Sequence, residues 1–345
     1  MCESVAAPCN KMILLPILLS SLWGEPSRCL AEVGGFTTEK NIRHFAVATN
    51  TVYVAAEDKL YQLNHDLTLV QNLTLRGILK NDARFYRGSV TNELNATFSV
   101  NILLPFVING TLVSCGVIEC GYCECGYCEV LDLKNISNVL YREHIQVGSP
   151  LRNSASVGFL VNEEGKHAYI LAALQKDVTK STGSSCPSGP EAVHLHNTNN
   201  IQRGFIFSTV GEHNTHVIKR EGSVEFVDGF QINSIIYLFS NLPARNTVRL
   251  IWLEGKATKK QTLESLRGAN LSLSADGGRG GRLLSSSVIP GGPPVLWSGV
   301  FSVDGGKTNT ELLLFDISPD LNMTADADPD FCSVCPVKKT KTVGP

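Results

Sequence analysis

The feature that most constrains the fold is a dense cluster of cysteines. Five of the chain's eleven cysteines lie within the fourteen residues from Cys115 to Cys128. An alternating apolar run, Glu129–Leu133, follows them and leads into an N-glycosylation sequon that begins at Asn135. Thiols packed this closely beside a sequon are typical of proteins that fold in an oxidising, extracellular compartment. The sequence therefore predicts a disulfide-bonded strand at this point.

The same cluster contains a tandem duplication. The five residues ECGYC at Glu119–Cys123 are repeated without a gap at Glu124–Cys128. Removing one copy leaves two outer cysteines eight positions apart, which can join the starts of two neighbouring strands. We interpret the second copy as an insertion.

The N-terminus predicts a signal peptide over residues 1–31. Met12–Gly24 is an apolar run too short to span a bilayer, and it lies between Lys11 and the small residue Ala31. A buried helix is the alternative, which Pro16 disfavours. Cleavage near Ala31 would leave eight cysteines, an even number suited to disulfides, and would remove Cys2, Cys9 and Cys29.

The remaining sequence indicates a secreted, disulfide-bonded glycoprotein. The candidate disulfide cysteines are Cys115, Cys120, Cys123, Cys125, Cys128, Cys186, Cys332 and Cys335. The candidate glycosylation sites are Asn72, Asn95, Asn109, Asn135, Asn270 and Asn322. No later stretch reaches the ~18 apolar residues of a membrane helix. A net charge of −2 provides no field that would attract nucleic acid.

From His44 onward, short β-rich runs alternate with polar turns. Four runs predict an antiparallel meander: 45–48, 52–56, 59–63 and 67–70. Such a meander buries one face only, so it needs further sheets. Continuous apolar strands resembling its second strand recur at 111–115, 168–172, 235–239 and 295–301. Their spacing of roughly 55–70 residues predicts an all-β propeller of four-stranded blades with long inserts, and only Gln261–Arg267 has helical periodicity.

Several of these segments resemble the sema domains of plexins, most closely those of the C type. The resemblance is carried by VYVAAEDKLYQLNHDL (Val52–Leu67), NILLPFVINGTLVSCG (Asn101–Gly116), FVDGF (Phe226–Phe230), GRLLSSSVIPGGPPVLWSGVFS (Gly281–Ser302) and the cysteine cluster with one ECGYC copy removed. It implies a seven-bladed propeller that binds the sema domain of a semaphorin. About five blades are expected here, so residues 32–345 are predicted to be a truncated sema domain.

The resemblance also implies where such a domain acts. Full-length plexins are single-pass proteins of the cell surface, and the expected partner is a semaphorin, with a GPI-anchored class 7 semaphorin as one candidate. No cofactor and no enzymatic activity are expected. The alternatives are a semaphorin-type ligand fragment, a secreted decoy or an extracellular propeller enzyme. An incomplete propeller leaves two apolar blade faces without partners, so we expect the isolated chain to be poorly stable.

The cysteines leave several alternatives open. CGYC occurs twice and matches the C-x-x-C redox motif, but that chemistry needs a thiol pKa lowered at a helix N-terminus. A zinc site could draw on the same cysteines and Cys332, although structural zinc sites usually join two pairs across a longer loop. Structural disulfides are favoured, with Cys115 joined to Cys123 or Cys128. The partner of Cys186 stays open, because Arg220 stands where the C-type pattern has a cysteine.

Other motifs do not indicate chemistry. His194 and His196 share one face of a predicted strand and precede His213 and His216, but no ligands converge on them. We therefore expect surface or turn histidines and no metal site. Gly305–Thr308 lacks the first glycine of a phosphate loop. No catalytic triad or carboxylate pair is evident, so no catalytic residue is predicted.

Overall fold

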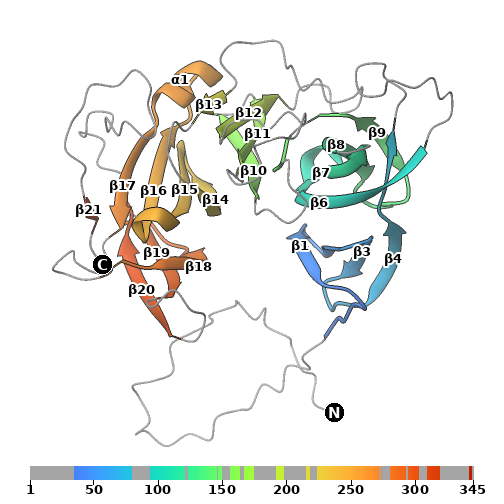
Figure 1. Cartoon of the computed structure of the whole chain (residues 1–345), viewed down its shortest axis with the longest axis horizontal. Coiled ribbons are helices and arrows are strands. Elements are labelled where there is room, and N and C mark those ends of the chain that lie inside the picture. The colour runs from blue at the N-terminus through green and yellow to red at the C-terminus, as the bar shows by residue number, and fades with distance from the viewer. Residues whose placement is uncertain are drawn as a thin grey trace, which may run out of the picture. The chain divides into compact units, whose positions relative to one another are not determined.

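The structure is a computed structural model in which strands account for nearly all regular elements. It describes residues 35–79, 94–120, 123–145, 147–149, 156–163, 167–174, 192–197, 215–217, 224–271, 273, 280–292, 294–302, 309–318 and 342–343. The strands form five sheets that follow one another along the chain, and Figure 1 colours them from blue to red in that order. The predicted signal peptide lies outside the described residues.

Sheet 1 is the predicted meander of four antiparallel strands. It contains β1 (Ile42–Val47), β2 (Thr51–Ala56), β3 (Lys59–Asn64) and β4 (Leu69–Thr74). The fourth strand begins two residues later than predicted. The reason is local: Leu67 has a φ of 67°, and the Asp66 carboxylate accepts the Thr68 N–H at 3.0 Å, so these residues form the turn.

The other four sheets are also built from antiparallel neighbours along the chain, with three to five strands each. Sheet 2 contains β5 (Arg76–Leu79), β6 (Leu94–Phe106), β7 (Thr111–Cys120), β8 (Cys123–Asp132) and β9 (Val139–Glu143). Sheet 3 contains β10 (Ser156–Glu163), β11 (His167–Leu174), β12 (Ala192–Asn197) and β13 (Thr215–Val217). Sheet 4 contains β14 (Glu225–Ile232), β15 (Ile235–Leu242), β16 (Thr247–Glu254), β17 (Arg267–Leu271) and the parallel β21 (Thr342–Val343). Sheet 5 contains β18 (Arg282–Val288), β19 (Leu296–Ser302) and β20 (Thr310–Asp316).

The recurring apolar strands were placed correctly by the sequence. The predicted segments at 111–115, 168–172 and 235–239 lie in β7, β11 and β15, and the segment at 295–301 begins one residue before β19. The expected helix is α1 (Lys259–Glu264), which begins two residues earlier than predicted because Thr258 caps it by accepting the Gln261 N–H. The predicted range extended to Arg267, but that residue already belongs to β17.

The apolar core consists of four clusters, and each is shared by one sheet and the next. Tyr53 of sheet 1 belongs to the same cluster as Phe98 of sheet 2. Sheets 2 and 3 share the second cluster, sheets 3 and 4 the third, and sheets 4 and 5 the fourth. Sheets that pack face to face in chain order are the blades of a β-propeller. The all-β propeller predicted from the sequence is therefore the observed fold.

A side-chain amide also joins each sheet to its neighbour. Gln62 donates to the Lys134 carbonyl in the turn between β8 and β9 of sheet 2, and Asn101 donates to the Ser149 carbonyl that precedes sheet 3. Gln231 of sheet 4 both donates to and accepts from the Asn162 backbone of sheet 3. Asn241 of sheet 4 makes the same two-way contact with the Leu283 backbone of sheet 5, at 2.9 and 2.8 Å. These amides fix the register between neighbouring blades.

The Asn241 contact should be worth measurable stability. Asn241 is 2% exposed and Leu283 is 1% exposed, so Asn241→Leu would leave a buried N–H and a buried carbonyl without partners. We expect the free energy of unfolding to fall by about 2 kcal/mol. Chemical denaturation would measure the change. Gln231→Leu is the matched control, because its contact lies at the surface where water can replace the amide. Equal losses in the two variants would contradict the assignment.

Candidate functional site

The disulfide-bonded hairpin is the most strongly specified local structure. Strands β7 and β8 pair without interruption from Thr111 and Asp132 to their far ends. Cys115 and Cys128 are directly opposite in this register, and a disulfide joins them with their Cα atoms 4.1 Å apart. Both cysteines are buried in the cluster that sheets 2 and 3 share. Of the two pairings that the sequence left open, the structure contains the one with Cys128.

The second ECGYC copy extends this hairpin rather than forming a separate site. The disulfide lies in the middle of the two strands, because the pairs from Gly116 with Tyr127 to Cys120 with Cys123 continue the hairpin beyond it. Neither CGYC copy precedes a helix, which is the usual setting for a lowered thiol pKa. Among the described residues, no group of three or more His, Cys, Asp or Glu side chains could hold a metal ion. Cys186, Cys332 and Cys335 lie outside the described residues, so their pairing stays a prediction.

A partly buried polar cluster lies on the opposite face of β8 from the disulfide, because Tyr127 and Glu129 alternate with Cys128 along the strand. The Tyr127 hydroxyl donates to Glu129 Oε1 at 2.9 Å, and Arg142 Nε donates to the same oxygen at 2.9 Å. Burial raises the pKa of the Glu129 carboxyl, although both hydrogen bonds oppose this shift. Burial and the neighbouring carboxylate also raise the pKa of Tyr127. The tyrosine therefore keeps its proton, and the Arg142 contact to Glu129 joins β9 to β8.

Aromatic contacts complete the setting of Tyr127. Its ring meets Phe98 edge to face with 5.0 Å between centroids, and it meets His144 in the same way at 5.5 Å. The sequence analysis missed this cluster. The available signal was Glu129, a charged residue on a strand between Cys128 and an apolar run. A carboxylate in that position needs a buried partner.

His194 and His196 are less exposed than the sequence predicted. Both residues lie on β12, as expected for one face of a strand, but they are half-buried and their rings stack with 5.7 Å between centroids. The residues opposite them, Ala172 and Ile170, belong to the core shared with sheet 2. Burial lowers the pKa of His194 to about 4 and that of His196 to about 3, with Lys259 and His194 adding to the second shift. The side chains of His213 and His216 are outside the described part.

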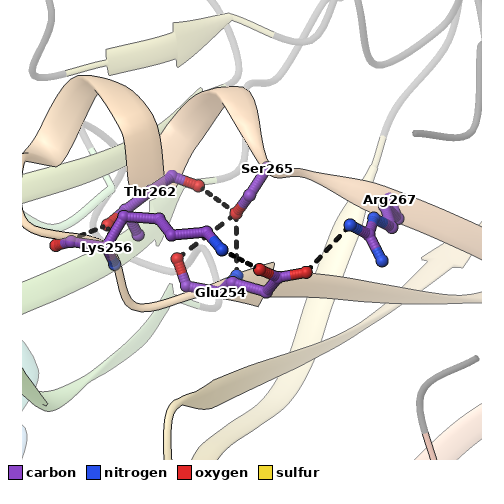
Figure 2. Close-up of polar contacts among 5 residues, drawn as sticks. All are labelled: Glu254, Lys256, Thr262, Ser265 and Arg267. Atoms are coloured by element: carbon purple, nitrogen blue, oxygen red, sulfur yellow. Dashed lines mark hydrogen bonds and ion pairs between the residues drawn. The ribbon is translucent and has the colours of Figure 1, made fainter. Parts of the chain in front are cut away.

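Polar side chains around α1 form hydrogen bonds and ion pairs within the segment that connects β16 to β17 (Figure 2). The Glu254 carboxylate pairs with Arg267 Nη2 at 2.8 Å and also with the Lys256 ammonium. These contacts lower the pKa of Glu254. Ser265 Oγ accepts the Glu254 N–H at 2.7 Å, and Thr262 Oγ1 accepts the Lys256 N–H at 2.9 Å. The Ser265 hydroxyl is thus part of the hydrogen-bond network that joins the end of β16 to α1.

Four of the predicted sequons lie where their asparagine side chains are described. Asn72, Asn109 and Asn135 are exposed, on β4, in the turn after β6 and in the turn after β8. Asn270 on β17 is half-buried, and its Oδ1 accepts a hydrogen bond at 3.2 Å from Arg249, which is 1% exposed. The side chains of Asn95 and Asn322 are outside the described set.

Glycan occupancy should follow this difference in burial. We expect Asn72, Asn109 and Asn135 of the secreted protein to carry glycans and Asn270 to be largely unmodified. The Asn270 amide is half-buried and held by the buried Arg249, so its Nδ2 is less accessible for attachment of a glycan than the three exposed amides are. Glycopeptide mass spectrometry after expression in mammalian cells would measure each occupancy. Full occupancy at Asn270 in folded protein would contradict this placement of its side chain.

The first and last described sheets expose apolar side chains on one face. Phe45 on β1 is 70% exposed, and Leu312 on β20 is 67% exposed. Their sequence neighbours Ala46 and Leu313 point the other way and pack on the core clusters. A third exposed apolar residue is Ile108 in the 3-10 turn Val107–Asn109, next to a sequon. These are the three most exposed large apolar side chains among the described residues, and each could contact a partner protein.

No protein-family model and no curated protein sequence matches this chain. Solved structures do. A structure of the full extracellular region of Plexin A4 is 15% identical, with a TM-score of 0.57 over 79% of this chain and 34% of that chain. A second structure of that region gives the same identity and score over 79% and 26%. Drosophila Plexin A in complex with Semaphorin 1b is 14% identical, with a TM-score of 0.50 over 80% and 51%.

These likenesses concern the fold. The chain spans about a third of the length of the first Plexin A4 chain. The sema-type β-propeller that the sequence patterns implied is the fold these structures share with it. None of the helices among the described residues combines the length and apolar character needed to cross a bilayer.

Proposed function

We propose that this chain is an extracellular protein-binding module, a plexin-like sema domain that recognises a semaphorin and catalyses no reaction itself. The observation that carries the proposal is the agreement between the fold and the sequence. The propeller matches plexin extracellular regions over about four-fifths of the chain, and the segments that resemble plexins lie on its strands. Drosophila Plexin A, one of the similar structures, is in complex with Semaphorin 1b.

The polar groups of the described residues support binding rather than catalysis. Hydrogen bonds join Tyr127 and Arg142 to the Glu129 carboxylate. The Ser265 hydroxyl accepts the Glu254 N–H and so joins α1 to the end of β16. An exposed aromatic side chain on a rigid strand is instead a typical anchor of a protein interface. Phe45 is the one aromatic residue among the exposed large apolar side chains that the structure describes.

A binding assay tests the proposal directly. The chain secreted by mammalian cells is immobilised, and soluble semaphorin ectodomains are passed over it, beginning with the GPI-anchored class 7 semaphorin that the C-type resemblance favours. We expect saturable binding to at least one semaphorin. Failure of every semaphorin to bind, under conditions where a plexin ectodomain binds its own, would contradict the proposal. Binding to plexins alone would instead identify a semaphorin-type ligand.

Two matched substitutions would locate the interface. Phe45→Glu places a charge on the exposed face of β1, and Leu312→Glu does so on β20. Both replace an exposed side chain, so neither should alter the core. Loss of binding in one variant but not in the other assigns the contact to that sheet.

A further inference from the structure

The end of the β7–β8 hairpin places two cysteines opposite each other. Five residue pairs follow the Cys115–Cys128 disulfide toward the hairpin end, and the last of them is Cys120 with Cys123. Only two residues separate these partners in the chain. Cys125, the remaining cysteine of the cluster, is opposite Ile118 and has no cysteine across from it.

The backbone register determines whether this second pair can bond. Antiparallel partners alternate between close pairs, with Cα atoms about 4.5 Å apart, and wide pairs at about 5.5 Å. The Cα separation of 4.1 Å between Cys115 and Cys128 identifies a close pair. Cys120 and Cys123 lie five pairs further, an odd number, so they form a wide pair. A separation of about 5.5 Å falls within the range of roughly 4.4–6.8 Å that disulfides span.

We propose that Cys120 and Cys123 form a second, reducible disulfide across the end of this hairpin, distinct from the buried Cys115–Cys128 bond. The reaction needs a low-molecular-weight disulfide such as oxidised glutathione. One cysteine thiolate attacks that disulfide and releases one glutathione thiol. The second cysteine then displaces the other glutathione, so two protein thiols are oxidised to one disulfide and one oxidised glutathione becomes two thiols.

The two disulfides should differ in their resistance to reduction. Exchange requires a thiolate to reach a sulfur atom, and Cys115 and Cys128 are 0% and 2% exposed within an apolar cluster. The hairpin end differs: the side chain of Glu119, next to Cys120, is exposed. The ring closed by Cys120 and Cys123 also contains few residues, so the cross-link restrains the unfolded chain only slightly. The Cys120–Cys123 disulfide is therefore expected to be reduced and re-formed readily. Its two cysteines are opposite each other because the ECGYC copy is duplicated.

The Cys120–Cys123 assignment also reduces the number of cysteines whose partners are unknown. If the signal peptide is removed and both hairpin disulfides form, the unassigned cysteines are Cys125, Cys186, Cys332 and Cys335. Their number is even, as a fully oxidised secreted domain requires. Cys125 then has to pair outside the hairpin.

Differential alkylation of the secreted full chain tests the proposal. The protein is equilibrated in glutathione buffers of increasing reduced fraction, alkylated, and cleaved after glutamate. This cleavage releases the sequence CGYCE twice, at Cys120–Glu124 and Cys125–Glu129, so a Cys125→Ser substitution is needed to distinguish the two peptides. We expect Cys120–Glu124 to be unalkylated and two hydrogens lighter in oxidising buffer. It should become doubly alkylated at a reduced fraction that leaves Cys115–Cys128 intact.

Two outcomes would overturn the proposal. One is alkylation of Cys120 and Cys123 in the oxidised protein, or their linkage to other cysteines. The other is opening of both disulfides at the same reduced fraction. Cys120→Ser provides an independent check in the chain that keeps Cys125: it should expose one new alkylatable thiol at Cys123. Absence of that thiol would count against the pair.

Discussion

Replacing Trp297 with alanine should lower the free energy of unfolding by about 4 kcal/mol, the cost expected when a fully buried tryptophan is truncated. Trp297 is the largest fully buried side chain of the described core. Its ring stacks on Phe239 of sheet 4 with 4.1 Å between centroids and also contacts Phe315 of its own sheet at 5.7 Å. Truncation would thus open a cavity between sheets 4 and 5. Denaturant unfolding followed by circular dichroism measures the loss.

Trp297→Phe separates the effect of volume from that of polarity. The indole N–H of Trp297 has no hydrogen-bond partner among the described residues, so burying it carries a cost that phenylalanine removes. We expect this variant to lose less than half as much stability as the alanine variant. Leu312→Ala, on the exposed face of the same sheet, should change stability by about 0.5 kcal/mol or less. If Trp297→Phe lowered the free energy of unfolding as much as Trp297→Ala does, the indole N–H would have to make a stabilising hydrogen bond, which would contradict its assignment as unpaired.

The parts of this fold that are determined by residues close together in the sequence were predictable. The first meander is specified by local turn chemistry, at Asn50 and at Asp58, and the strands begin and end close to those turns. The recurring apolar strands β7, β11 and β15 are continuous apolar runs because both of their faces are buried, whereas β19 alternates between buried and half-buried residues. The β4 boundary was displaced because Asp66 and Leu67 form a turn where alternation of residue types had suggested a strand.

Contacts between distant segments were not predictable. The Asn241 amide pairs with a backbone 42 residues away, and the Tyr53 hydroxyl donates to the Leu133 carbonyl 80 residues away. The burial of His194 has the same origin, since it depends on the neighbouring strand β11 and on a core shared with another sheet. The choice of Cys128 over Cys123 likewise required the register of β8 against β7. Sequence patterns specify each strand, whereas packing between sheets specifies the candidate site.

Acidification from pH 7.5 to pH 5 should destabilise the chain through His194 and His196. The pKa of these histidines is lowered by burial to about 4 and about 3, so both rings stay neutral in the folded chain throughout this range. In the unfolded chain they titrate near the ordinary pKa of about 6.5 and bind protons as the pH falls. The unfolded state then holds more protons than the folded state, and stability declines with pH. At 1.36 kcal/mol per pH unit, each histidine contributes about 2 kcal/mol of loss, or about 4 kcal/mol for the pair.

The test is the pH dependence of unfolding in wild-type protein and matched variants. The decline should begin as the pH falls through about 6.5, and the His contribution should level off only near the folded pKa values, below pH 4. His194→Gln and His196→Gln should each remove about half of the loss, and the double variant should remove most of it. His65→Gln serves as control, because His65 is exposed in the turn before β4. His44 contributes to the decline in the same direction in every variant, since burial and Arg43 also lower its pKa. A double variant that loses as much stability as the wild type between pH 7.5 and 5 would show that the buried pair is not the acid-sensitive element of this propeller.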